Sequence, residues 1–270
     1  MTTRADCRYT PRMLGFLVKK AFFDMWDHFL GALVINLGFL LLCMVPFSAF
    51  QFVGALSPAA FVGIIALGVL LLFVYAGPAS LLARDMTNYE AAEWKNFVKY
   101  LKQTWFQSLI LGLIYVVGIV VVWVGFTTYL SMEGFLGLAA TVFLFWAVVI
   151  WLLASQFYFP VLARLDSKIS KILRKSFILF FDNTFFAFVL GFGVLLTSAV
   201  SVVTALLFPG IAGVLIWHQA AVKLRLLKYD YLEENPSANR KKIPWDALLV
   251  EEKERVGKRT LRGMIFPWKE

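Results

Sequence analysis

Long apolar stretches follow one another along the chain and limit its fold more than any other sequence feature. Five of them lie at about 29–52, 58–82, 105–126, 138–162 and 184–207. A helix of ~20 apolar residues crosses the ~30 Å hydrocarbon layer of a bilayer. The chain is 60% hydrophobic, whereas soluble domains have roughly 45–50% apolar residues. In water this excess would form large exposed patches, so the sequence predicts an all-α, polytopic helical membrane protein.

The basic residues are confined to segments between these stretches. Residues 1–28, 83–104, 163–183 and 223–270 contain 5, 4, 5 and 12 Lys or Arg, which accounts for all 26. Basic loops stay on the cytoplasmic side of a membrane. A shorter apolar segment, 211–222, suits a re-entrant or interfacial segment by length alone. Because 223–270 must share a side with the other basic segments, we expect 211–222 to cross. The prediction is six transmembrane helices, with both termini in the cytoplasm.

This topology divides the chain into three parts. They are a cytoplasmic basic amphipathic leader (1–28), a six-helix transmembrane domain (29–227) and a cytoplasmic basic tail (228–270). The leader lacks the short apolar region and small-residue cleavage site of a signal peptide. Its apolar residues instead predict a helix at the membrane interface, with Phe22, Phe23 and Trp26 at headgroup depth.

The tail begins with a turn-rich linker and continues from Asp246 as a charged helix that is weakened at Gly257. Its last residues, 264–270, combine basic and aromatic side chains. Such segments favour the membrane interface. We therefore expect this end to fold back onto the membrane surface, with docking to a partner as the alternative.

The two basic linkers inside the transmembrane domain have apolar and cationic side chains at helical spacing, which predicts amphipathic helices. Such helices bind anionic headgroups through Lys and Arg and the acyl boundary through aromatic and apolar residues. The predicted membrane-surface residues are Trp94, Lys95, Lys99, Lys102 and Trp105, followed by Lys168, Lys171, Arg174 and Lys175. Ile169, Leu173 and Phe177 are expected to face lipid. The net charge of +9 is thus assigned to the lipid bilayer and its anionic headgroups, not to nucleic acid.

The second linker repeats features of the first. LLAR at 81–84 corresponds to LAR at 162–164, and Ser108 and Gly112 correspond to Ala187 and Gly191. One interpretation is a parallel repeat near 58–126 and 138–207. The other is that positive-inside topology produced similar linkers independently.

Three stretches carry a resemblance to a known family. They are WDHFLGALVINLGFLLLCMVPF, AGPASLLARDMTNYEAAEWKNFVKYLKQTWFQSLILG and YFPVLARLDSKISKILRKSFILFFDN. In them the chain resembles the uncharacterised bacterial YesL-like integral membrane proteins over most of residues 26–190, whereas the tail after Lys228 departs from the pattern. The resemblance implies a bacterial inner (cytoplasmic) membrane protein encoded beside carbohydrate uptake systems, and it implies no catalytic residue.

Neutral polar residues are the remaining candidates for a site, because the six spans contain no Asp, Glu, Lys or Arg. The candidates are Asn36, Gln156, Ser198, Ser201, His218 and Gln219. They form either a pathway for a neutral, hydroxyl-rich solute or hydrogen bonds between helices, and helix packing is favoured because such bonds are common in membrane proteins. Coupling to protons or sodium is disfavoured, since ion-coupled carriers place ionisable groups in their spans.

We expect no catalytic, cofactor or metal site. His218 is isolated in sequence from other ligating residues, whereas zinc takes three or four ligands, and no hydrolase motif is present. The predicted function is that of a non-enzymatic accessory component, which presents its cytoplasmic loops and tail to a membrane-protein partner such as a carbohydrate uptake system. The alternative is a transporter for a neutral solute, not coupled to protons or sodium.

Overall fold

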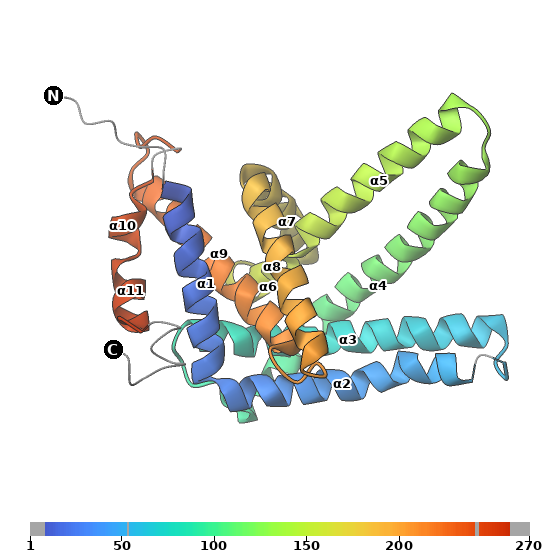
Figure 1. The fold of residues 1–270 in the computed structure, drawn as a ribbon, viewed down its shortest axis with the longest axis horizontal. Helices are drawn as coiled ribbons and strands as arrows, with labels where there is room; N and C mark the ends of the chain where they lie inside the picture. The colour runs from blue at the N-terminus through green and yellow to red at the C-terminus, as the bar shows by residue number, and fades with distance from the viewer. Residues whose placement is uncertain (1–8, 53, 241–242, 260–270) are drawn as a thin grey trace.

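The computed structural model describes residues 9–52, 54–240 and 243–259, and within them it contains helices and no strand (Figure 1). The helices are α1 (Tyr9–Asp27), α2 (Phe29–Gln51), α3 (Pro58–Thr87), α4 (Lys95–Ser131), α5 (Phe135–Ser155), α6 (Tyr158–Arg164), α7 (Ile169–Asp182), α8 (Thr184–Val203), α9 (Gly210–Glu234), α10 (Trp245–Leu248) and α11 (Val250–Val256). The predicted all-α fold is confirmed.

Five helical segments of the described chain are long and apolar enough to cross a membrane. They are Phe29–Gln51, Pro58–Thr87, Lys95–Ser131, Phe135–Arg164 and Thr184–Val203, the fourth combining α5 with α6. Each covers most or all of one of the five long apolar stretches of the sequence. These helices fit a multi-pass membrane protein.

The sixth crossing is not confirmed. Residues 211–222 form the first half of α9, which continues without a break through Lys223, Arg225 and Lys228. Nearly half of α9 is buried, because it packs against α1, α2, α3, α6 and α8. This helix is therefore a central packing element of the fold.

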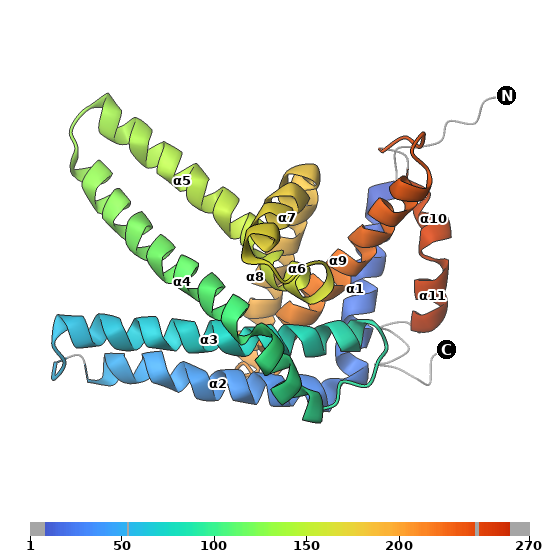
Figure 2. The same cartoon turned by 180° about the vertical axis from the view of Figure 1, so that it is seen from behind.

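The hairpins α2–α3 and α4–α5 extend away from the rest of the molecule in diverging directions (Figures 1 and 2). Where α3 and α4 cross, small residues let the backbones approach closely. A Cβ atom at Gly77 would overlap the Ser108 side chain, and one at Gly112 would lie 2.9 Å from Phe73 Cβ. Beyond this crossing the two hairpins separate, which leaves the outer halves of their apolar helices widely exposed.

Similar contacts occur within each half of the suspected repeat. Ser108 on α4 faces Gly77 on α3, and in the second half the backbone oxygen of Ala187 on α8 accepts a hydrogen bond from Gln156, at the end of α5. Gly112 faces Phe73, and Gly191 faces Leu153. These contacts are compatible with a parallel repeat and with independent linkers.

The two linkers differ in how they continue. The first becomes part of α4, a single helix of 37 residues that begins at Lys95. The second forms α7, which ends at Asp182 before α8 starts. At the break Asn183 leaves helical geometry, and its side chain donates to Leu179 O and Tyr229 Oη.

The leader and the tail pack together on the protein. Met13, Leu17 and Phe23 of α1 are buried in the same core cluster as Trp245 and Val256 of the tail. Phe23 therefore faces protein, whereas Trp26 is 46% exposed.

The predicted tail helix forms as two short helices, α10 and α11, and ends at Gly257, whose φ of +72° favours glycine. Residues 264–270, expected at the membrane surface, lie outside the described residues.

Candidate functional site

The neutral polar residues predicted as site candidates lie in several separate parts of the fold. Asn36, 1% exposed, fixes the turn between α8 and α9. Its Nδ2 donates to Leu207 O and Pro209 O, both at 2.9 Å, and its Oδ1 accepts from Ala212 N at 2.8 Å. Ser201 Oγ accepts from Gly210 N at 2.9 Å in the same turn. Both residues thus have packing roles.

Gln219 and Ser198 lie in different surroundings from these two residues. Gln219 is buried, where its Oε1 accepts from Arg164 Nε at 2.7 Å and its Nε2 donates to Ser80 Oγ at 2.8 Å. Ser198 is exposed on α8. Gln219 therefore joins α3, α6 and α9, as the helix-packing interpretation proposed for this set.

Gln156 and His218 share a cavity of about 410 Å³ between the bases of the hairpins and α9. Gln156 Oε1 and His218 Nε2 are buried and have no hydrogen-bond partner among the described residues. The remaining lining is largely apolar and includes Phe39, Phe73 and Phe159. Since Asn36 is not part of this lining, the cavity suits a mostly apolar molecule with one neutral polar group better than a hydroxyl-rich solute.

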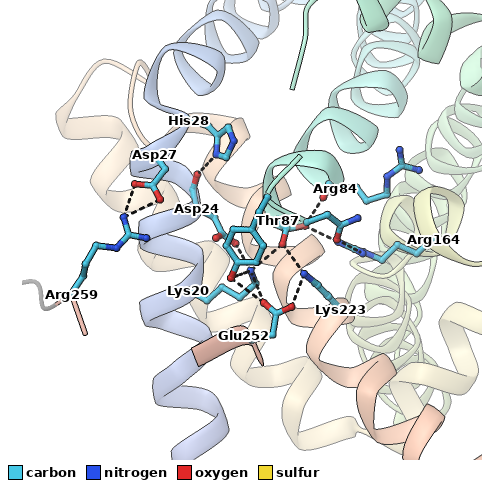
Figure 3. Close-up of polar contacts among 12 residues, drawn as sticks. Lys20, Asp24, Asp27, His28, Arg84, Thr87, Arg164, Lys223, Glu252 and Arg259 are labelled. Carbon is cyan, nitrogen blue, oxygen red and sulfur yellow. Dashed lines mark hydrogen bonds and ion pairs between the residues drawn. The ribbon is translucent and has the colours of Figure 1, made fainter. Parts of the chain in front are cut away.

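Sequence reasoning missed a cluster of buried charges where α1, α9 and α11 meet the end of α3 (Figure 3). Lys20, completely buried, lies 3.0 Å from Asp24 Oδ2 and 3.0 Å from Glu252 Oε2. Lys223 Nζ lies 2.6 Å from Glu252 Oε1. Both lysines donate to Thr87 O at 3.0 Å. We call Lys20, Asp24, Thr87, Lys223 and Glu252 the charge cluster.

Burial and charge act differently on the two acids of the charge cluster. Burial raises the pKa of Asp24 to about 6, against the opposing effect of Lys20. Burial would also raise the pKa of Glu252, but Lys20 and Lys223 outweigh it and lower this pKa below its ordinary value. Glu252 is thus the ionised partner of both lysines at neutral pH, whereas Asp24 takes up a proton in mildly acidic solution.

A second polar group adjoins the charge cluster and connects α3 with α6. Arg164 donates to Thr87 Oγ1 at 2.6 Å and to Asn88 Oδ1 at 3.1 Å, while Arg84 donates to Ala163 O at 3.1 Å. Each of the two arginines that end an LAR sequence therefore contacts the segment that contains the other. Because Lys20 and Lys223 also reach Thr87, all four basic segments meet at this end of the molecule.

One sequence signal for this arrangement existed. Lys20 and Asp24 are four residues apart, a spacing that pairs charges on a helix. The partners from other segments could not be identified, since Glu252 lies near the opposite end of the chain from Lys20. The charged side chains of the cluster are directed at one another across three helices, so its evident role is to lock these helices together.

The predicted membrane-surface residues lie on the outside of this same end. In the first linker Trp94, Lys95, Lys99, Lys102 and Trp105 are exposed. In the second, Lys168, Lys171 and Arg174 are exposed, and Lys175 is partly covered, 3.4 Å from Asp166. Ile169, Leu173 and Phe177 are half-buried against the core, with Ile172 and Leu179 making the buried face of α7.

Comparison with protein families, curated proteins and solved structures gives no match to the chain. The similarity to YesL-like proteins therefore stays a prediction from the sequence.

Proposed function

We propose that the chain is a non-enzymatic accessory protein of the bacterial inner membrane, which presents a folded cytoplasmic surface to a membrane-protein partner such as a carbohydrate uptake system. In this proposal both termini are cytoplasmic. The convergence of all four basic segments on Thr87 supports one shared side, because basic segments are retained in the cytoplasm.

The charge cluster carries the proposal. Removing each ion from water costs several kcal/mol, and the cost is offset only when partners are well placed. Lys20, Lys223 and Glu252 have such partners at 2.6–3.0 Å. A tail that served only as a tether would stay solvated, whereas this one is held in a fixed place on α1 and α9. A tail held in this way gives the end of the molecule around α1, α9 and α11 a defined surface, which binding to a partner requires.

The fixed tail also indicates which surface is presented. On α11 Glu252 and Val256 face inward, while Glu251, Glu254 and Arg255 are exposed. This mixed-charge face contains no aromatic side chain, whereas the first linker exposes Trp94 and Trp105, which suit a membrane surface. We therefore place the contact with the partner on α11.

Site-specific photo-crosslinking in native membranes tests this surface. A photoreactive residue at Glu254 should yield a protein adduct, and the adduct should weaken when Glu252→Gln loosens α11. The matched control is Phe143, a site that is 77% exposed on the apolar part of α5. Lipid adducts alone from both sites would contradict the proposal.

A specific observation favours a second candidate, binding or uncoupled transport of a neutral solute. This observation is the pair of unpartnered atoms, Gln156 Oε1 and His218 Nε2, in one cavity of the described chain. The solute would have an apolar body and one neutral polar group. Purified protein should carry such a molecule, detected by mass spectrometry, and Gln156→Leu should lose it while Ser198→Ala retains it. Equal retention by both variants would eliminate this candidate.

A further inference from the structure

We propose a binding site for a phosphate-bearing anion where α7, α8 and α9 meet the start of the ordered tail. The site is a second cavity, of about 310 Å³, and three cationic side chains line it: Arg225, Lys228 and Arg240. It is independent of the accessory role and of the cavity that contains Gln156 and His218.

Arg225 is the strongest indication. Its guanidinium lies over the ring of Phe186, 4.0 Å from the centroid, and 5.6 Å from the ring centroid of Trp245. Its Nε is buried and has no hydrogen-bond partner among the described residues. A buried donor without an acceptor destabilises the folded state, and more so when the group is charged. An acceptor from outside the chain would remove this destabilisation.

The shape of the guanidinium restricts the ligand. Its donors form a rigid planar fork that matches two oxygens of a carboxylate or phosphate. Its contacts with the rings of Phe186 and Trp245 help to hold the guanidinium at the cavity. Arg225 is thus held ready to bind an oxyanion.

The charge balance favours phosphate over a carboxylate. Asp182 is the carboxylate of the lining, and its Oδ2 already lies 2.8 Å from Lys228 Nζ and accepts from Tyr229 Oη at 2.6 Å. Burial would raise its pKa, but these hydrogen bonds lower it below the ordinary value, so Asp182 is ionised at neutral pH. One negative charge therefore faces three positive charges. A phosphate group with up to two negative charges restores neutrality.

The position of the cavity supports the same ligand. Thr184, Phe185 and Phe186, the first residues of α8, contribute to its lining, and the N-cap residue Asn183 makes no side-chain cap hydrogen bond. A helix N-terminus carries partial positive charge and attracts anions. Since α8 is one of the five apolar spans, its start lies where lipid headgroups and dissolved phosphate compounds can both arrive.

Two probes distinguish these sources. Detergent-purified protein is titrated with inorganic phosphate, and binding is followed by calorimetry. In parallel, protein in nanodiscs is examined by native mass spectrometry for retention of phosphatidylglycerol in competition with phosphatidylcholine. Binding of inorganic phosphate identifies a soluble phosphate ligand, and selective retention of phosphatidylglycerol identifies an anionic lipid. Either result supports the site.

Variants then locate the binding. Arg225→Met keeps an apolar side chain beside Phe186 and should weaken binding of the effective probe roughly 10- to 100-fold, as expected for lost charge-assisted hydrogen bonds. Arg240 is exposed, so we expect Arg240→Gln to leave the fold intact. This variant should also weaken binding of the effective probe. Lys258→Gln is the control, because Lys258 is exposed in the tail after α11 and outside the cavity. The proposal is overturned if neither probe binds the unmodified protein, or if Lys258→Gln weakens binding as much as Arg240→Gln.

Discussion

At the scale of single residues, Asn36 shows how a polar side chain inside an apolar span is used. It satisfies two carbonyls and one N–H in the turn that joins α8 to α9. The sequence predicted a choice between a solute pathway and packing for this residue, and the structure gives it a packing role. The partners of Asn36 could not be predicted, because they are backbone atoms from a distant part of the chain. Every residue type has such atoms, so the sequence does not indicate which of them Asn36 contacts.

Replacing Asn36 with Leu should destabilise the protein. The change leaves Leu207 O, Pro209 O and Ala212 N without their partner in a buried turn. We expect a loss of about 1–3 kcal/mol in the free energy of unfolding, the range for a buried group left unsatisfied. Denaturant unfolding in detergent measures it, with Ser198→Ala as a control expected to change little. A value for Asn36→Leu equal to that of the control would contradict the assigned role.

At the scale of elements, the amphipathic patterns predicted helices correctly but not their surroundings. The leader and linkers are predicted to be basic and amphipathic and the tail to contain a charged helix, and α1, α7 and α11 are helical. The apolar face of α1 packs on protein, however, because α9 and the tail supply a partner for it. Hydrophobic periodicity indicates that one face of a helix will be buried. It does not distinguish burial in lipid from burial in a protein core, because both produce the same pattern.

The charge cluster that joins α1 to α11 should make stability depend on pH through Asp24. Its pKa is raised from 3.8 to about 6, so the folded protein holds this proton more tightly than the unfolded chain. The folded state therefore loses stability as pH rises from about 4 to about 6, and the loss stays constant at higher pH. Two pKa units correspond to about 3 kcal/mol.

Asp24→Asn removes this titration and leaves the other groups in place. The difference in Tm between the unmodified protein and Asp24→Asn, followed from pH 4 to pH 7, isolates the contribution of Asp24. The pKa of Glu252 is lowered, so protonation of Glu252 at the acidic end of the interval destabilises both proteins. This contribution is present in both Tm curves and is removed when one is subtracted from the other. Parallel Tm curves over the whole interval would show that Asp24 does not titrate as its burial requires.

At the scale of the whole molecule, the hairpins diverge from a shared base around α9 (Figure 2). Apolar length predicted five spanning helices and basic-residue counts predicted a common side for the four polar segments. The arrangement of the spans could not be predicted, because helix packing in lipid depends on close approach at small residues such as Gly77 and Gly112 and not on apolar character.

The turn between α8 and α9 bears directly on the number of crossings. It is held by Asn36, which lies two helical turns after the start of α2 at Phe29, or about 10 Å along the helix. The turn between α2 and α3 lies at the far end of α2. If the chain enters the bilayer along α8 and returns along α9 without reaching the opposite surface, α2, α3, α4 and α5–α6 make four crossings. The tail then stays on the same side as the other basic segments. With six crossings, the α8–α9 turn must instead reach the opposite surface.

Cysteine labelling in intact cells separates these topologies. In a background with Cys7 and Cys43 replaced by Ser, a cysteine at Glu133, between α4 and α5, should react with an impermeant reagent. One at Ser237 should react only after the cells are opened, because all four basic segments meet at the end of the molecule that includes α9 and the tail. A third, at Val203, is 87% exposed at the end of α8. Reaction of Val203→Cys from outside indicates six crossings, and protection both before and after opening indicates a hairpin that turns within the bilayer. Labelling of Ser237→Cys from outside would refute both topologies, since it would place the charge cluster and the basic tail on the outer face.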